Sequence, residues 1–120
     1  MTRHDDKIYL QHMLSYAREA LQHAQGSTRE EIESDRLLQL ALLHLVEIVG
    51  EAASKVSPAT QARLGRLPWR GMIGMRNRII HGYDTAEIGV LWDTLQQDLP
   101  QLIQMLEQEL PNFEERDSGE

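Results

Sequence analysis

Three polar side chains in the segment Gly71–Tyr83 (GMIGMRNRIIHGY) have the types and spacing that chemistry on a phosphodiester requires. Arg76 carries a planar, permanently charged guanidinium that matches a phosphate group. His81 carries an imidazole whose ordinary pKa lies near 6.5, so it can accept or donate a proton at neutral pH. Asn77 could orient either partner or a phosphate oxygen. We expect Arg76 and His81 to be catalytic, with Asn77 assisting.

The residues around this segment indicate which phosphodiester would be cleaved. No cluster of carboxylates lies nearby in the sequence to hold Mg²⁺, so we expect metal-free chemistry with neither metal nor cofactor. The simplest metal-free route uses the ribose 2′-hydroxyl as the nucleophile, which makes RNA the substrate and leaves DNA inert. His81 could be the general base for that hydroxyl or the acid for the leaving oxygen.

The spacing of an Arg and a His alone is a weak signal. The same Arg-x4-His spacing occurs at Arg18 and His23, where Glu19 follows the Arg and would repel a phosphate. That copy also lacks a glycine directly after the His, which would end a helix, and a Tyr after that glycine. We interpret it as a solvated helix face.

The segment itself is expected to be helical. Its apolar residues recur at helical spacing and predict one buried face, formed by Met72, Ile73, Met75, Ile79 and Ile80. Pro68 would sit in the first turn and Gly82 at the C-terminal stop, with Tyr83 just beyond. Asn77 and His81, four residues apart, would then share a face. Trp69 is either a packing anchor or a surface for base stacking.

The rest of the chain predicts an all-α fold. A first helix should run from Asp5 or Asp6 to about Gln25 and stop at Gly26, with a capping box formed by Ser27 and Glu30. The segment 36–55 is apolar over most of its circumference, so it is the central helix or part of a dimer seam. A short helix should follow Pro58, and a last helix should begin near residues 84–85 and be bent or interrupted at Pro100.

Length and composition are those of one domain. A chain of 120 residues that is 41% hydrophobic can bury one core, which we place in residues 1–110, with an acidic flexible tail at 111–120. There is no Cys, no run of eighteen apolar residues and no apolar signal-peptide region near the N-terminus. These features predict a cytoplasmic protein without a membrane partner.

Charge is segregated along the chain. Residues 52–83 contain no Asp or Glu and carry a charge of +6; because the whole chain carries −7, the remainder carries −13. This basic segment is either an electrostatic footprint for a phosphate chain or a partner for acidic helices. In the first case Arg70, Arg78 and Trp69 are the candidates for RNA contact.

Three polar residues interrupt the apolar segment 36–55. His44, Glu47 and Glu51 occur at i, i+3 and i+7 and therefore lie on one side of the expected helix. They could support the catalytic residues, or they could form a His–Glu pair at the rim of the fold. A His–Glu pair alone is too few ligands for a metal ion, so these residues are not assigned as metal ligands.

The sequence around the motif resembles the HepT-like branch of the HEPN superfamily. The resemblance rests on RNRIIHGY preceded by PWRGMIGM, and on DRLLQ at 35–39, EIVGEAA at 47–53, LWDT at 91–94 and DLPQL at 98–102. It covers roughly residues 5 to 110, nearly the whole chain. It implies a four- to five-helix up-and-down bundle that forms a homodimer.

The resemblance also implies roles for individual residues. Arg76 and His81 would be the ribonuclease residues, with Asn77 assisting. Tyr83 would be the position that a partner nucleotidyltransferase antitoxin of the MNT type modifies with AMP to silence a toxin of a type VII-like pair. Two alternatives are a non-catalytic module that binds the nucleotidyltransferase and a helper that presents ATP to it.

Overall fold

The computed structural model describes residues 3–81 and 85–118, with side chains described for 5–80 and 87–113. The helices in chain order are α1 (Arg3–Ala24), α2 (Arg29–Ser34), α3 (Arg36–Lys55), α4 (Pro58–Arg63), α5 (Trp69–Ile73), α6 (Met75–Ile79), α7 (Ile88–Asp93), the π-helix η1 (Thr94–Asp98) and α8 (Leu99–Ser118). Two short strands, β1 (Ile80–His81) and β2 (Thr85–Ala86), lie between α6 and α7.

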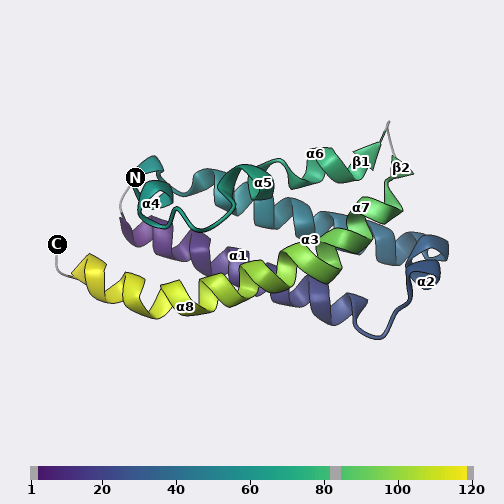
Figure 1. The fold of residues 1–120 in the computed structure, drawn as a ribbon, viewed down its shortest axis with the longest axis horizontal. Coiled ribbons are helices and arrows are strands. Elements are labelled where there is room, and N and C mark those ends of the chain that lie inside the picture. The colour runs from purple at the N-terminus through teal and green to yellow at the C-terminus, as the bar shows by residue number, and fades with distance from the viewer. Residues whose placement is uncertain (1–2, 82–84, 119–120) are drawn as a thin grey trace.

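The helices form an elongated bundle of 50 × 28 × 20 Å (Figure 1). α1, α3, the α5–α6 pair and the α7–η1–α8 run follow the long axis in alternating directions. α1 packs along α3 and α8, and α3 also contacts α5 and α6. The side chains buried between them include Leu10, Met13, Leu42, Val49, Met72, Ile79, Leu91, Leu99 and Leu106. The prediction of an all-α, up-and-down bundle is confirmed.

The first helical boundaries follow from local capping. Gly26 has a φ of +81°, the left-handed conformation that ends a helix and favours glycine. The capping box of α2 is formed by Thr28 and Glu31, whose side chains accept from each other's backbone N–H at 3.1 and 2.7 Å. The predicted box of Ser27 and Glu30 was wrong by one residue, because Ser27 still belongs to the turn after Gly26.

The central helix is α3. It begins at the capping residue Asp35, whose carboxylate accepts from the Leu38 N–H at 3.0 Å, and it ends at Lys55 as predicted. By length and composition it is apolar enough to cross a membrane. In the bundle it packs against α1, α5 and α6, which accounts for part of its apolar composition, while Leu37 and Leu40 near its start stay exposed.

The motif segment is two short helices rather than one. Gly74, with φ −89° and ψ 3°, separates α5 from α6, and α6 ends at Ile79. Ile80 is extended, and it and His81 form β1, which pairs antiparallel with β2. The N–H of Glu87 donates to the carbonyl of Ile79 at 2.6 Å and so caps the end of α6.

This strand overturns one prediction about the motif. Asn77 lies on α6, whereas His81 lies on β1, so the two do not share a helix face. The helix ends three residues before the predicted stop at Gly82 because strand pairing with β2 replaces the next helical turn. Gly82 and Tyr83 lie outside the described residues.

The last helical run begins at Ile88, after β2, rather than near residues 84–85. The predicted irregularity near Pro100 is a π-helix: the N–H of Leu99 bonds to the carbonyl of Thr94, five residues back. Proline has no N–H and collides with the carbonyl four residues before it, so the chain widens ahead of Pro100. No sharp bend is needed, and α8 continues from η1.

The predicted flexible tail at 111–120 differs from the structure at its beginning. α8 continues through Pro111 to Ser118. Phe113 is 1% exposed, and its ring lies under the guanidinium of Arg63 at 4.2 Å. Burial of this aromatic ring stabilises the continuation of α8 past Leu110.

Candidate functional site

Arg76 projects from α6 toward α3. Its Nε lies 2.7 Å from Oε2 of Glu47, and the side chains of the two residues are 54% and 44% exposed. The pair therefore joins the motif helix to the central helix at the protein surface. Because the Arg76 side chain is about half exposed at the surface, a phosphate can reach it without any rearrangement of the core.

Glu47 connects Arg76 to His44. Its second oxygen, Oε1, lies 3.8 Å from Nδ1 of His44, one turn earlier on α3. His44 is 71% exposed. Glu51, the third polar residue predicted on this face, is exposed one turn further along α3. The structure thus brings His44 and Glu47 to Arg76, whereas the roles predicted for all three residues stay predictions.

A surface hollow of about 340 Å³ lies beside this group. Its lining combines charged and apolar side chains from α3 and from the motif segment: Arg36, Leu40, Leu43, His44, Glu47, Arg76 and Ile80. Among these, Leu40 is 45% exposed. Leu37, one turn earlier on α3, is 79% exposed. An exposed apolar surface next to a charged hollow is typical of a protein–protein contact.

The backbone of His81 lies next to this hollow. His81 is the residue after Ile80, which lines the hollow, and it pairs with Thr85 across the strands. The imidazole of His81 and the whole of Tyr83 lie outside the described residues. The approach of that imidazole to Arg76, and the modification of Tyr83, stay predictions.

The other predicted contact residues take different positions. Trp69 is 9% exposed, and its Nε1–H donates to the carbonyl of Leu64 at 3.0 Å, so it is the packing anchor of the two alternatives. Arg70 and Asn77 are exposed on α5 and α6. Arg78 leaves α6 toward η1, where its guanidinium lies 3.8 Å from the carboxylate of Asp98.

For the basic segment 52–83 the structure supports pairing with acidic helices of the same chain, whereas the phosphate footprint stays a prediction. Arg76 and Arg78 pair with carboxylates of α3 and η1, as expected if the segment matches acidic helices of its own chain. Arg66 and Arg70 are exposed, as a phosphate-binding surface would need. Within the described residues, no group of three or more His, Cys, Asp or Glu side chains could hold a metal ion.

The second Arg-x4-His copy is a solvated face, as predicted. Arg18 forms an ion pair with Glu107 of α8, and Nε2 of His23 lies 3.5 Å from the carboxylate of Glu19. All four side chains are about half exposed. This copy is therefore a natural control for experiments on the motif.

The fold and the motif together define an all-α, HEPN-type helical protein. The family model described as "Ribonuclease HepT-like" matches residues 13–109, and the chain therefore belongs to this family. The resemblance inferred from the motif is confirmed. Ribonuclease is accordingly the activity that the family supports.

Several curated relatives match most of the chain. A candidate RNase from Methanocaldococcus jannaschii is 24% identical over 116 residues, which cover 97% of this chain and 100% of the relative. The "Probable ribonuclease HepT" of Thermococcus cleftensis is 33% identical over 88 residues, 70% of this chain and 80% of the relative. A candidate RNase from Caldanaerobacter subterraneus is 28% identical over 94 residues, 78% of this chain and 84% of the relative. No solved structure matches the chain significantly.

Proposed function

We propose that the protein is a metal-independent endoribonuclease whose catalytic residues are Arg76 and His81, assisted by Asn77. The observation that carries the proposal is the position of Arg76: its half-exposed side chain borders an open hollow in a member of a ribonuclease family. Because Glu47 contacts the Nε side of the guanidinium, the terminal amino groups are the ones that a phosphate would contact.

The reaction needs only a base, an acid and a cation. The 2′-oxygen attacks phosphorus while its proton passes to a base, the bond from phosphorus to the 5′-oxygen breaks, and an acid protonates the leaving oxygen. The products are a 2′,3′-cyclic phosphate and a 5′-hydroxyl. Arg76 stabilises the negative charge that develops on the phosphoryl oxygens, and His81 transfers one of the two protons.

A homodimer would complete this sparse set of groups. Leu37 and Leu40 expose apolar surface beside the hollow, where a second copy could cover it. In a two-fold arrangement the same surface is used by both copies, so each hollow would lie near the motif of the other. A second Arg76 could then act on the same phosphate.

In its cellular setting we assign the protein to a type VII-like toxin–antitoxin pair in the cytoplasm. The partner is an MNT-type nucleotidyltransferase that attaches AMP to Tyr83 and silences the toxin. The support is the family membership and the place of Tyr83 in the chain, two residues after His81. AMP would add bulk and negative charge where the substrate phosphate must bind.

A non-catalytic module that binds the nucleotidyltransferase is the second candidate. Its specific support is the Arg76–Glu47 pair, which could be a structural link between α6 and α3. The exposed leucines of α3 would then be the docking surface for the partner.

One assay separates the two candidates. Purified protein is incubated with structured and unstructured RNAs in excess EDTA, and the ends of the products are mapped. We expect cleavage with 2′,3′-cyclic phosphate ends, abolished in Arg76→Ala and unchanged in the control Arg18→Ala. An inert wild-type protein that binds the nucleotidyltransferase tightly would favour the module and contradict the ribonuclease.

A further inference from the structure

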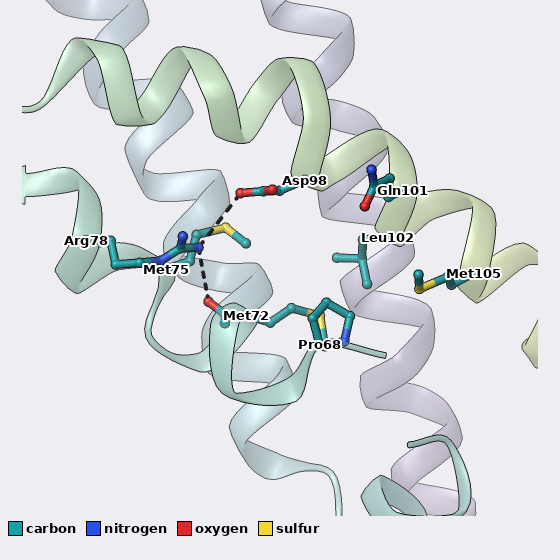
Figure 2. A pocket seen from close by; sticks show the side chains of 9 residues that line it. Pro68, Met72, Met75, Arg78, Asp98, Gln101, Leu102 and Met105 are labelled. Carbon is teal, nitrogen blue, oxygen red and sulfur yellow. Dashed lines mark hydrogen bonds and ion pairs between the residues drawn. The ribbon is translucent and has the colours of Figure 1, made fainter. Parts of the chain in front are cut away.

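A second hollow, on the side of α6 that faces η1 and α8, suggests how the substrate is selected (Figure 2). Its volume is about 220 Å³. Drug-sized ligands occupy sites of roughly 300–1,000 Å³, so this hollow fits a smaller body such as one heteroaromatic ring system. Its apolar lining comes from Pro68, Met72, Met75, Leu102 and Met105, and its polar lining from Arg78, Asp98 and Gln101.

Polar groups lie along one edge of the hollow, where Leu102 and Met105 of α8 stand beside them, and the opposite edge is apolar. Figure 2 shows Asp98 and Gln101 along the edge formed by η1 and α8, and Pro68 and Met72 along the opposite edge. Arg78 reaches in from α6 between the two edges. A flat ring could therefore lie against methionine and proline while its polar edge faces a cation and a carboxylate.

The π-helix determines where Asp98 points. In an α-helix each residue turns the side chain by about 100°, so a π turn, with its extra residue, redirects the side chains that follow. Asp98 is the last residue of η1. π-Helical turns occur frequently at functional sites, and this one ends at a carboxylate that lines the hollow.

The contacts between the polar groups are long. The guanidinium of Arg78 lies 3.8 Å from the carboxylate of Asp98 and 3.4 Å from the carbonyl of Gly71. The side chains of Arg78 and Asp98 are 50% and 44% exposed. Such exposed, long contacts contribute little to stability, so both groups can turn to a ligand at small cost.

We propose that this hollow binds one guanine base of the RNA substrate, an inference that rests on the proposed ribonuclease function. Guanine presents two adjacent N–H donors, at N1 and the 2-amino group, which fit a single carboxylate. Its O6 and N7 are acceptors that fit a guanidinium. The other bases do not present two adjacent donors beside an acceptor, so Asp98 and Arg78 together favour guanine.

The position of the hollow suits a strand bound at Arg76. Arg76 and Arg78 leave opposite sides of α6, a helix of five residues that is only about 7 Å long. Asn77 is exposed between them in the sequence. A strand that crosses α6 can place a phosphate at Arg76 and a neighbouring base in the hollow.

Methionine methyl signals provide a direct test. Three of the five methionines line the hollow, namely Met72, Met75 and Met105, whereas Met13 is buried in the core between α1 and its neighbours. Protein labelled with ¹³C at the methionine methyl groups is titrated with guanosine, inosine, adenosine, cytidine and uridine 5′-monophosphates. We expect guanosine monophosphate to shift the three lining signals and leave that of Met13 in place.

The affinity for each nucleotide should depend on how many N–H donors its base offers to Asp98. Inosine lacks the 2-amino group and should bind about tenfold more weakly than guanosine, and the other nucleotides at least as weakly as inosine. Asp98→Asn should reduce guanosine affinity about tenfold and remove the preference over inosine. The control Asp93→Asn changes an exposed carboxylate at the end of α7 by the same charge and should leave both values unchanged.

The outcomes separate this inference from the proposed function. Lining signals that do not move with any nucleotide, or that move equally with all of them, overturn the guanine site. Lining signals that shift with protein concentration alone overturn it too, because a second copy then covers the hollow. Guanosine binding in a protein that cleaves no RNA would overturn the ribonuclease and leave the base site standing.

Discussion

At the scale of single residues, Arg76 depends on a partner far away in the chain. Glu47 lies on a different helix and holds the Nε side of the guanidinium at 2.7 Å. A half-exposed ion pair contributes about 0–1 kcal/mol to stability. Its consequence should therefore be geometric: Glu47 fixes the direction in which the guanidinium meets a phosphate, and small errors of placement at a reacting group reduce rates strongly.

We expect Glu47→Ala to lower kcat for RNA cleavage about tenfold with little change in KM or thermal stability. Glu47→Gln keeps an acceptor for the Nε–H and should retain more activity than the Ala variant. Glu51→Ala is the matched control: its exposed carboxylate lies one turn further along α3 and does not line the hollow, so it should behave as wild type, against the supporting role that the sequence left open for it. Steady-state kinetics on one RNA measures kcat and KM for the wild type and each variant. Equal kcat values for Glu47→Ala and wild type would contradict the positioning role of Glu47.

The sequence predicts part of this site. The residue types in the motif single out Arg76, and the interruption of an apolar helix singles out His44 and Glu47. Their meeting is not predictable, because it depends on how two helices lie against each other. The hollow beside Asp98 is beyond sequence reasoning for the same reason, since its carboxylate is aimed by a π-helix that only the packed chain reveals.

At the scale of elements, the motif depends on a close contact between α5 and α3. A Cβ at Gly50 would lie 2.8 Å from the carbonyl oxygen of Met72, closer than real Cβ atoms come to such an atom. Only glycine allows α5 to pack this tightly on α3. The position of α6, and with it Arg76, follows from that contact.

Gly50→Ala should lower the free energy of unfolding by about 1–3 kcal/mol, since the backbone of α5 must move to admit the methyl group. Gly71→Ala is the control: a Cβ there meets only Pro68 at 3.9 Å, so helix propensity should make it neutral or stabilising by about 0.5–1 kcal/mol. Urea denaturation of the two variants measures both values. Equal stabilities would mean that the α3–α5 contact is not tight.

The buried carboxylate of Asp6 links α1 to the start of α4 by hydrogen bonds. Asp6 of α1 is 0% exposed and accepts from the N–H and Oγ of Ser57, at 2.9 and 2.6 Å, and from Oγ1 of Thr60 at 2.6 Å. Asp6→Ala should lower the free energy of unfolding by about 1–3 kcal/mol because buried donors lose their acceptor. Asp6→Asn keeps one acceptor oxygen and should lose less. Thermal unfolding followed by circular dichroism compares the wild type and the two variants. An unchanged midpoint for Asp6→Ala would show that these hydrogen bonds do not stabilise the fold.

Element boundaries show where sequence reasoning stops. The limits of α3 follow from its apolar run and the Asp35 cap, and Gly26 marks the end of α1 by its own backbone preference. The end of the motif helix does not follow, because Ile80 and His81 leave the helix to pair with a strand. Such pairing is a tertiary contact that competes with local propensity.

At the scale of the whole molecule, activity is expected to depend on a second copy. The exposed leucines of α3 lie near the end of the bundle that also carries the motif strand, whereas Ile8, 39% exposed, belongs to the start of α1 at the opposite end (Figure 1). Exposed apolar surface rimmed by polar residues marks protein–protein interaction sites. A two-fold copy would cover the hollow beside Arg76 in both protomers at once.

The double variant Leu37→Glu with Leu40→Glu should be monomeric and lose RNA cleavage while its helical content is unchanged, because like charges would face each other across the two-fold. Ile8→Glu should stay dimeric and active. Size-exclusion chromatography with light scattering measures the mass. A dimeric double variant, or a fully active monomer, would contradict the proposed interface.

A mixture of two dead variants tests whether the site is shared between copies. If Arg76 of one protomer and His81 of the other act on the same phosphate, mixing Arg76→Ala with His81→Ala and allowing subunits to exchange should restore cleavage to about a quarter of wild type. Half of the dimers would then be mixed, each with one intact site of two. No recovery after verified exchange would place Arg and His of one protomer in each site.

The most direct measurement is single-turnover RNA cleavage by wild type, His81→Ala and His23→Ala in the absence of divalent metal. A positioned acid or base contributes about 10²- to 10⁴-fold to a rate. We predict a loss of that size for His81→Ala and none for His23→Ala, whose imidazole has the same spacing from an arginine but lies on the solvated face of α1. Cleavage by His81→Ala at the wild-type rate would contradict the account.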